Sequence, residues 1–165
     1  MIPFNKPFII GKELEYIQDA VKNLNLSGNG KYTKLCNEYI ERLSGAKKVL
    51  LTPSCSDALE MCALLLDIKE GDEIVVPSFT FVTTVSSFVL RGAKPIFVDI
   101  RNDTQNIDEN LIEPAITKKT KAIVVVHYAG VSCDMDKIMQ IAKKHNLYVI
   151  EDAAQAFDSF YEKKY

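Results

Sequence analysis

Two adjacent carboxylates follow an apolar run late in the sequence. Leu147–Ile150 is mostly β-forming and leads directly into Glu151 and Asp152, after which small residues follow at positions 153 and 154. Such a run after a polar helical segment is typical of a buried parallel strand, and open α/β sheets bind ligands at the carboxyl ends of their strands. Asp152 is therefore a candidate ligand-binding group. Because acids also cap helix N-termini, a purely structural role for Glu151 and Asp152 stays open.

A second candidate is the turn Leu51–Glu60. Pro53 ends an apolar run, small polar residues follow, and a helix is expected to begin near Ser56. The free backbone N–H groups at a helix N-terminus bind anions such as phosphate. The turn matches neither a Walker loop nor G-x-G-x-x-G, which disfavours nucleoside triphosphates and dinucleotides as ligands. Alternatively, Ser56 or Asp57 simply caps the helix, with Glu60 completing a capping box from Asp57.

Two aromatic residues follow another apolar run. Phe79 and Phe81 come shortly after Ile74–Val76, where a ring could offer a flat face to a planar ligand, although such rings are more often core. Two residues apart on a helix, they cannot both face inward, so one can be core while the other lines the crevice.

These three turns are expected at one edge of the sheet. A phosphate site, an aromatic ring and a carboxylate together match a planar, cationic heteroaromatic that carries a phosphate. Pyridoxal phosphate has this chemistry, because a carboxylate that keeps its ring nitrogen protonated makes the ring an electron sink.

A thiol enzyme is an alternative interpretation of the same edge. Cys55 would be a nucleophile at a helix N-terminus, where a thiolate is favoured, and His127 would be its base. A zinc site is disfavoured, because the four cysteines show no C-x-x-C pairing and the chain has two histidines.

The pattern of apolar runs and helical segments predicts a mostly parallel sheet that would position these candidate side chains. Beyond Lys47, apolar runs alternate with helical segments, as in βαβ units. The expected strands are Val49–Leu51, Ile74–Val76, Ile96–Val98, Ala122–Val126 and Tyr148–Ile150. The expected helices between them are Ser56–Asp67, Phe79–Leu90, Asp108–Ile116 and Asp134–His145, with two earlier helices at Gly11–Asn23 and Tyr32–Leu43.

Composition bounds the class of protein. The chain has 165 residues, 47% hydrophobic and 25% charged, with a net charge of −2, which is typical of one soluble globular domain. Without a basic surplus, nucleic acid is not an expected partner. The longest apolar run, Met61–Leu66, is too short to cross a bilayer, and the first residues lack the layout of a secretion signal. We therefore expect a cytoplasmic protein with no membrane contact.

Several stretches together resemble the DegT/DnrJ/EryC1/StrS family of nucleotide-sugar aminotransferases. The similar stretches are Leu26–Gly30, Gly71–Val75, Gly92–Asp99, Val126–Gly130 and Glu151–Gln155. Met1–Asn5 and Leu51–Cys55 are most similar to one branch, the TDP-4-oxo-6-deoxy-D-glucose transaminases, which form TDP-4-amino-4,6-dideoxygalactose. The resemblance implies the fold type I (aspartate aminotransferase-type) α/β architecture, with a mostly parallel sheet and helices on both faces. It also implies a role in surface polysaccharide biosynthesis, such as that of lipopolysaccharide or enterobacterial common antigen.

The resemblance further implies roles for particular residues. Pyridoxal 5′-phosphate would be the cofactor, with Asp152 on its pyridinium nitrogen and Gln155 on its ring hydroxyl oxygen. Phe81 would stack on the ring. Cys55, Ser56 and Asp57 match the phosphate-binding turn, although the family usually has a small residue at position 57, and a carboxylate there repels phosphate unless it turns away.

The resemblance also divides the chain. Residues 1–46 would form an N-terminal arm and helices, and residues 47–165 part of the cofactor-binding large domain, without the small C-terminal domain. The family's Schiff-base lysine lies beyond Tyr165, after a turn that begins near Tyr161–Tyr165. We therefore expect no catalytic residue in this chain and no transamination by it alone.

The resemblance implies three partners. They are a nucleotide sugar as substrate, glutamate as amino donor, and a second copy of the chain in a homodimer or higher oligomer. Leu26–Tyr32 would serve the partner's site or form a structural loop. Two other functions stay open: a dehydratase of the same family, in which histidine replaces the lysine, and a truncated, non-catalytic dimerisation fragment.

Overall fold

The computed structural model describes residues 2–3 and 6–162. The chain divides into two compact units, residues 1–51 and residues 52–165. Of the motifs above, residues 1, 4 and 5 of the opening stretch and residues 163–165 lie outside the described residues. No helix in the described part of the chain is long and apolar enough to cross a membrane. The domain boundary expected after residue 46 stays a prediction.

The first unit contains two helices, α1 (Glu13–Lys22) and α2 (Lys31–Ser44), which confirm the two helices expected there. A polar cluster joins them. The Asp19 carboxylate accepts hydrogen bonds from Lys31 Nζ at 2.9 Å and from the Tyr32 hydroxyl at 2.8 Å. This cluster fixes the end of α1 against the start of α2.

The prediction of a strand at Val49–Leu51 is wrong. These residues have no regular secondary structure, because side chains of α2 take the backbone groups that a neighbouring strand would pair. The Glu41 carboxylate accepts the N–H of Val49 at 3.1 Å, and the Asn37 side-chain oxygen accepts the N–H of Leu51 at 3.1 Å.

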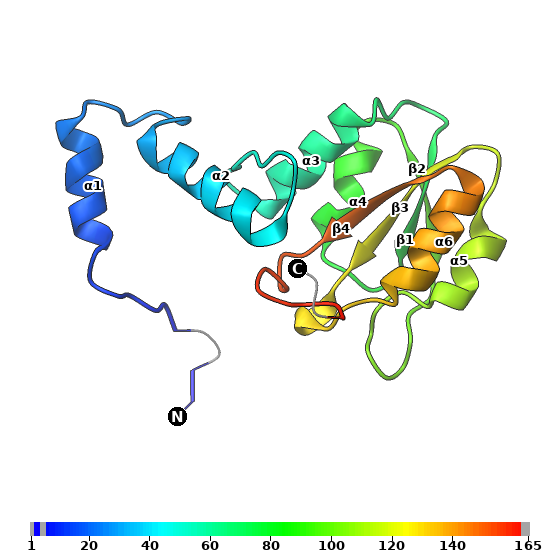
Figure 1. The fold of residues 1–165 in the computed structure, drawn as a ribbon. Helices are drawn as coiled ribbons and strands as arrows, with labels where there is room; N and C mark the ends of the chain where they lie inside the picture. The colour runs from blue at the N-terminus through cyan, green and yellow to red at the C-terminus, as the bar shows by residue number, and fades with distance from the viewer. Residues whose placement is uncertain (1, 4–5, 163–165) are drawn as a thin grey trace. The chain divides into compact units, whose positions relative to one another are not determined.

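The second unit is built on a four-stranded sheet of order β2-β1-β3-β4, in which every pairing is parallel (Figure 1). Its strands are β1 (Glu73–Pro77), β2 (Lys94–Val98), β3 (Thr120–Val126) and β4 (Tyr148–Asp152). They confirm the remaining four expected strands within one or two residues at each end. β-Branched residues dominate β1 and β3, the two central strands, which suits strands buried on both faces.

Helices cover both faces of this sheet, as the α/β interpretation predicted (Figure 1). Helices α3 (Cys55–Leu65) and α4 (Val82–Val89) pack on one face, and α5 (Glu109–Ala115) and α6 (Met135–His145) on the other. Alternate residues of each central strand enter the two cores. The first core includes Leu59, Ile74, Phe88 and Val124, and the second includes Val75, Ile112, Ile123 and Ile138.

Special backbone positions return the chain from helices to strands. Gly92 has φ +91°, and a Cβ there would lie 2.9 Å from Glu70 Cα, so the return into β2 requires glycine. Asn146 ends α6 in the left-handed region at φ 55°, which asparagine tolerates better than most residues.

The last strand differs from its expected burial. β4 pairs with β3 alone and forms an edge of the sheet, so Tyr148 is 57% exposed rather than enclosed on both sides. Ile150 and Asp152 are buried. The strand is therefore parallel, as predicted, but only half-buried.

Candidate functional site

Asp152 ends β4 at the carboxyl edge of the sheet. The strand register places it beside Val126, the last residue of β3, and the residue is 6% exposed. Its Oδ2 accepts the Thr84 hydroxyl at 2.7 Å, and its Oδ1 accepts the Ala154 N–H at 3.1 Å. The Cys55 thiol lies 3.5 Å from the same Oδ1. Groups from α3, α4 and the segment after β4 thus meet at one buried carboxylate.

Hydroxyl groups connect the N-termini of α3 and α4. Thr84 is fully buried, and its Oγ1 accepts the Thr80 hydroxyl at 2.9 Å. One residue earlier, Thr83 Oγ1 accepts the Ser56 hydroxyl at 2.9 Å. The structure therefore brings Cys55, Ser56 and Asp152 together. Thr83 and Thr84 were not predicted as site residues from the sequence. The one feature that could have indicated them is their position in the first turn of a helix that follows a strand.

The turn before α3 is a helix cap with a different register from the one expected. Ser54, rather than Ser56 or Asp57, is the N-cap, and its Oγ accepts the Asp57 N–H at 3.1 Å. The Ser54 hydroxyl in turn donates to Asp57 Oδ2 at 2.7 Å. A box between Asp57 and Glu60 was wrong. The Asp57 carboxylate is held by the cap, and the first N–H groups of α3 have no partner within the helix.

Gln155 lies beside a tight turn after β3. This turn is the short helix η1 (Tyr128–Gly130), and the N–H of Ala129 donates to Gln155 Oε1 at 2.7 Å. Ala129 has φ 53° and ψ 25°, a left-handed conformation that disfavours residues with a Cβ. The side chain of Gln155 is thus oriented by a backbone group.

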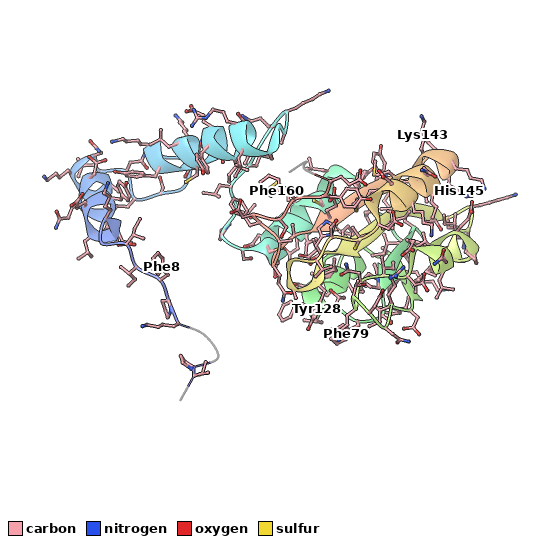
Figure 2. The ribbon with its side chains drawn as sticks, turned by 60° about the horizontal axis from the view of Figure 1, so that its bottom comes forward. Phe8, Phe79, Tyr128, Lys143, His145 and Phe160 are labelled. Atoms are coloured by element: carbon pink, nitrogen blue, oxygen red, sulfur yellow. The ribbon has the colours of Figure 1, made fainter. Side chains whose placement is uncertain are left out.

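The two aromatic residues of the second turn precede α4 rather than lying within it. The expected helix start at Phe79 was wrong, because Phe81 is the N-cap with an extended backbone. Phe79 packs against Tyr128 with ring centroids 5.2 Å apart, and Figure 2 shows the two rings together. It is 45% exposed, so the expectation of one core ring was also wrong. Phe81 is 71% exposed and borders a cavity of about 330 Å³ with Phe97.

The amino-acid sequence matches one known protein family. The model of the DegT/DnrJ/EryC1/StrS aminotransferase family matches residues 7–165. The chain belongs to this family. Its members are pyridoxal-phosphate-dependent sugar aminotransferases, and the resemblance noted from the sequence is confirmed at the level of the family.

Three similar proteins show how much of their length this chain covers. The chain is 41% identical to GDP-perosamine synthase of Escherichia coli O157:H7, over 99% of this chain and 45% of that protein. The aminotransferase of Psychrobacter cryohalolentis has a TM-score of 0.90 at 37% identity, over 96% of this chain and 41% of that one. A GDP-4-keto-6-deoxymannose-3-dehydratase has the same TM-score at 27% identity, over 99% of this chain and 44% of that one. The chain therefore spans less than half the length of these relatives.

The residues at the sheet edge fit the cofactor of the DegT/DnrJ/EryC1/StrS family. Asp152 is buried, yet among residues 2–3 and 6–162 no lysine, arginine or histidine forms an ion pair with it. A buried carboxylate is costly unless it is paired or well hydrogen-bonded, and its three donors carry no charge. A protonated ring nitrogen would supply the cation, and the start of α3 would receive a phosphate.

The thiol interpretation is disfavoured by the same geometry. His127 Nδ1 accepts the Cys133 N–H at 3.2 Å, so in the neutral ring Nε2 carries the proton and donates to Glu151 Oε2 at 2.9 Å. Both ring nitrogens are therefore engaged away from Cys55. Although Cys55 is exposed at the surface, partial desolvation of its thiol and the nearby Asp152 carboxylate raise the pKa of Cys55 to about 11.

Alkylation should report this raised pKa directly. At neutral to mildly alkaline pH, Cys55 should react with iodoacetamide about tenfold more slowly than a thiol with an ordinary pKa, since the thiolate fraction falls about 100-fold while its greater basicity recovers about tenfold in nucleophilicity. Peptide mass spectrometry over time measures the rate. Asp152→Asn should accelerate the reaction, because removing the carboxylate lowers the pKa of Cys55. If Cys55 were instead labelled first among the four cysteines, a nucleophilic role would regain support.

Proposed function

We propose that this chain is the cofactor-binding part of a pyridoxal-phosphate-dependent aminotransferase that transfers the amino group of glutamate to a 4-oxo-6-deoxy nucleotide sugar. The observation that carries the proposal is Asp152, a buried carboxylate with hydrogen-bond donors but no cation among the described residues. Amino transfer is proposed for the whole protein. For this chain the proposal concerns binding and orientation of the cofactor.

Each predicted residue has a distinct role in this proposal. When bound, pyridoxal phosphate supplies an electron sink that stabilises negative charge on the substrate carbon. Asp152 would keep the ring nitrogen protonated, and Gln155 would donate its side-chain amide hydrogen to the ring hydroxyl oxygen while its Oε1 stays on Ala129. Phe81, whose ring is exposed before α4, would cover one face of the cofactor ring.

The phosphate would lie at the N-terminus of α3. The N–H groups of Cys55 and Ser56 would donate to it, because a helix N-terminus favours anions. The objection raised by the Asp57 carboxylate is weakened by its hydrogen bond with Ser54, which holds it in the cap. In this proposal the Asp57 side chain stays in the helix cap and does not contact the phosphate.

Transamination has more support than dehydration. The identity is 37% with the aminotransferase of known structure and 27% with the dehydratase at equal TM-scores. TDP-4-oxo-6-deoxyglucose is the substrate implied by the motifs, whereas the relative with 41% identity is a GDP-perosamine synthase. Glutamate-dependent amination by the whole protein, compared on TDP- and GDP-linked 4-oxo-6-deoxy sugars, would distinguish these two bases.

The setting of this activity is part of the proposal. The four cysteines are free thiols, which suits a reducing compartment such as the cytoplasm. A homodimer is proposed as the assembly, with Leu26–Tyr32 contributing to the partner's site. Surface polysaccharide synthesis is the proposed pathway class.

Binding of pyridoxamine 5′-phosphate tests the proposal most simply. This amine form carries the same ring and phosphate, and unlike the aldehyde it does not react with surface lysines. Isothermal titration calorimetry of the chain should show one site, and pyridoxamine without its phosphate should bind more weakly. Equal dissociation constants for the two compounds, or no saturable binding, would favour the non-catalytic dimerisation fragment instead.

A further inference from the structure

One buried amide side chain holds both ends of the turn that orients Gln155. Asn106, in the loop between β2 and α5, is 2% exposed. Its Oδ1 accepts the Tyr128 N–H at 2.9 Å, and its Nδ2 donates to the Val131 carbonyl at 2.9 Å. Because the backbone N–H can only donate and the carbonyl can only accept, the orientation of the amide is determined. The residues at both ends of the turn, Tyr128 and Val131, are therefore hydrogen-bonded to the same side chain.

The turn between these anchors is strained. Ala129 adopts the left-handed conformation described above, which costs roughly 1–3 kcal/mol for a residue with a Cβ. Such a conformation persists when surrounding contacts determine it. The Ser159 hydroxyl donates to the Gly130 carbonyl at 3.0 Å, and Asn106 holds the flanking positions. Released from them, the Ala129 N–H would no longer point at Gln155 Oε1.

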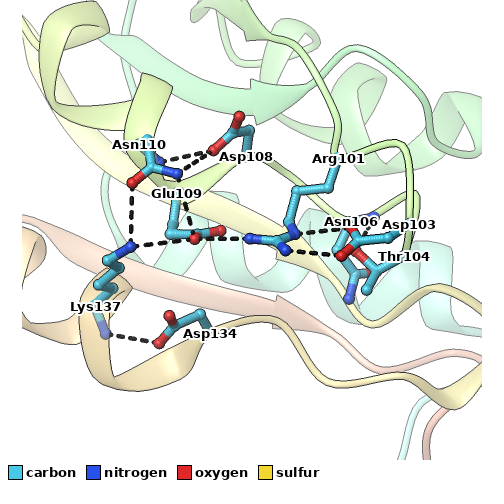
Figure 3. Close-up of polar contacts among 9 residues, drawn as sticks. All are labelled: Arg101, Asp103, Thr104, Asn106, Asp108, Glu109, Asn110, Asp134 and Lys137. Carbon is cyan, nitrogen blue, oxygen red and sulfur yellow. Dashed lines mark hydrogen bonds and ion pairs between the residues drawn. The ribbon is translucent and has the colours of Figure 1, made fainter.

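The loop that carries Asn106 is itself fixed by charges. Figure 3 shows Arg101 between two carboxylates, at 2.8 Å from Asp103 and 3.0 Å from Glu109, which is 3% exposed and also 3.4 Å from Lys137 Nζ. The Arg101 guanidinium lowers the pKa of Asp103 to about 2, so this pair stays charged at neutral pH. The backbone N–H of Arg101 also donates to the Asn106 carbonyl at 2.9 Å, and the Arg101 carbonyl accepts the N–H of Gln105 at 3.0 Å. These ion pairs and hydrogen bonds therefore hold the loop that positions Asn106.

We propose that Asn106 is a positioning residue that sets the side chain of Gln155 by clamping the turn Tyr128–Gly130. The consequence for cofactor binding rests on the proposed function, in which Gln155 contacts the ring hydroxyl. The placement of Gln155 does not rest on it, and can be tested without any ligand.

Amide hydrogen exchange tests the clamp. In the full chain, Asn106→Ala should accelerate exchange of the Tyr128 and Ala129 amides at least about tenfold, because local opening becomes easier. Asn102→Ala is the matched control, an exposed asparagine in the same loop, and should leave both amides unchanged. Asn106→Asp keeps an acceptor for the Tyr128 N–H and should retain most of its protection.

A double-mutant cycle tests the link to Gln155. The dissociation constant of pyridoxamine 5′-phosphate should rise about fivefold to tenfold in Asn106→Ala, the size expected for one lost hydrogen bond, and similarly in Gln155→Ala. The two effects should not add, since both remove the same contact. Asn106→Asp keeps the acceptor for the Tyr128 N–H but loses the donor to the Val131 carbonyl, so its affinity should lie between those of Asn106→Ala and the unmodified chain.

The outcomes separate the two claims. Unchanged exchange in Asn106→Ala, or additive losses of affinity, would overturn the role of Asn106. A chain with no affinity for pyridoxamine 5′-phosphate would overturn the proposed function, while exchange of the Ala129 amide would still judge the clamp. Should Asn106→Ala fail to fold, Asn106→Asp decides: faster exchange at Val131 with Tyr128 protected supports the clamp, and no change at either contradicts it.

Discussion

Asp152→Ala is expected to weaken the binding of pyridoxamine 5′-phosphate by about 100-fold. Removing one partner of a buried, hydrogen-bonded charge pair costs about 2–5 kcal/mol, and each 1.4 kcal/mol is a factor of ten. The loss should be large because the carboxylate is 6% exposed, so water cannot replace it on the ring nitrogen. Calorimetric titration of the variant beside the unmodified chain gives the ratio of the two dissociation constants.

Stability should respond to this carboxylate in a different way. Asp152→Asn removes the uncompensated negative charge but keeps one oxygen, which can accept the Ala154 N–H, while the new amide can donate to the Thr84 hydroxyl oxygen in place of the present Thr84 hydrogen bond. Its ligand-free unfolding free energy should equal or exceed that of the unmodified chain, while its affinity falls. Asp158→Ala, an exposed acid nearby in the sequence, should change neither quantity. Equal binding by Asp152→Ala and the unmodified chain would remove Asp152 from the site.

Phe88→Ala should produce the largest loss of stability in the sheet-containing unit, about 3–5 kcal/mol, as expected for truncating a fully buried aromatic side chain. Phe88 of α4 is 0% exposed and belongs to the same buried core cluster as Ile74 and Val76 of β1. Typical domains have only about 5–15 kcal/mol of stability, so a large share of it depends on this ring. Because the chain has no tryptophan, urea unfolding should be followed by circular dichroism.

Phe81→Ala is the matched control for that experiment. The two rings belong to the same helix or its cap, but Phe81 is 71% exposed, so its loss should change stability by less than about 1 kcal/mol. On the proposed function it should instead weaken binding of pyridoxamine 5′-phosphate. A large stability loss in Phe81→Ala would show that its ring is structural, and a small one in Phe88→Ala would contradict the assigned core.

The sheet was predictable because its signal is local. β1 and β3 are apolar, β-branched runs between helical segments, and the parallel direction of the strands follows from the alternation of strands and helices. Val49–Leu51 carries the same local signal and is not a strand, because side chains from α2 occupy its N–H groups. A competing hydrogen-bond partner of that kind depends on tertiary placement, which periodicity does not report.

The candidate site was predictable only in part, for a related reason. Asp152 could be placed at a strand end from its neighbours alone, whereas its bond to Thr84 joins residues that are 68 apart in sequence. The cap of α3 was misplaced because Ser54, Ser56 and Asp57 are all good N-cap residues. Asn106 looked like any loop asparagine, since nothing local reveals that it reaches the turn after β3.

On the proposed function, pairing of the cofactor with Asp152 would couple the lifetime of the protein to the supply of the cofactor. A ligand that binds only the folded state adds RT ln(1 + [L]/Kd) to its stability, about 2.7 kcal/mol at a concentration 100 times Kd. On the proposed function, a cell short of vitamin B6 would hold this unit in its least stable state. Proteolysis of the unfolded fraction would then lower the amount of the protein as the supply of the vitamin falls.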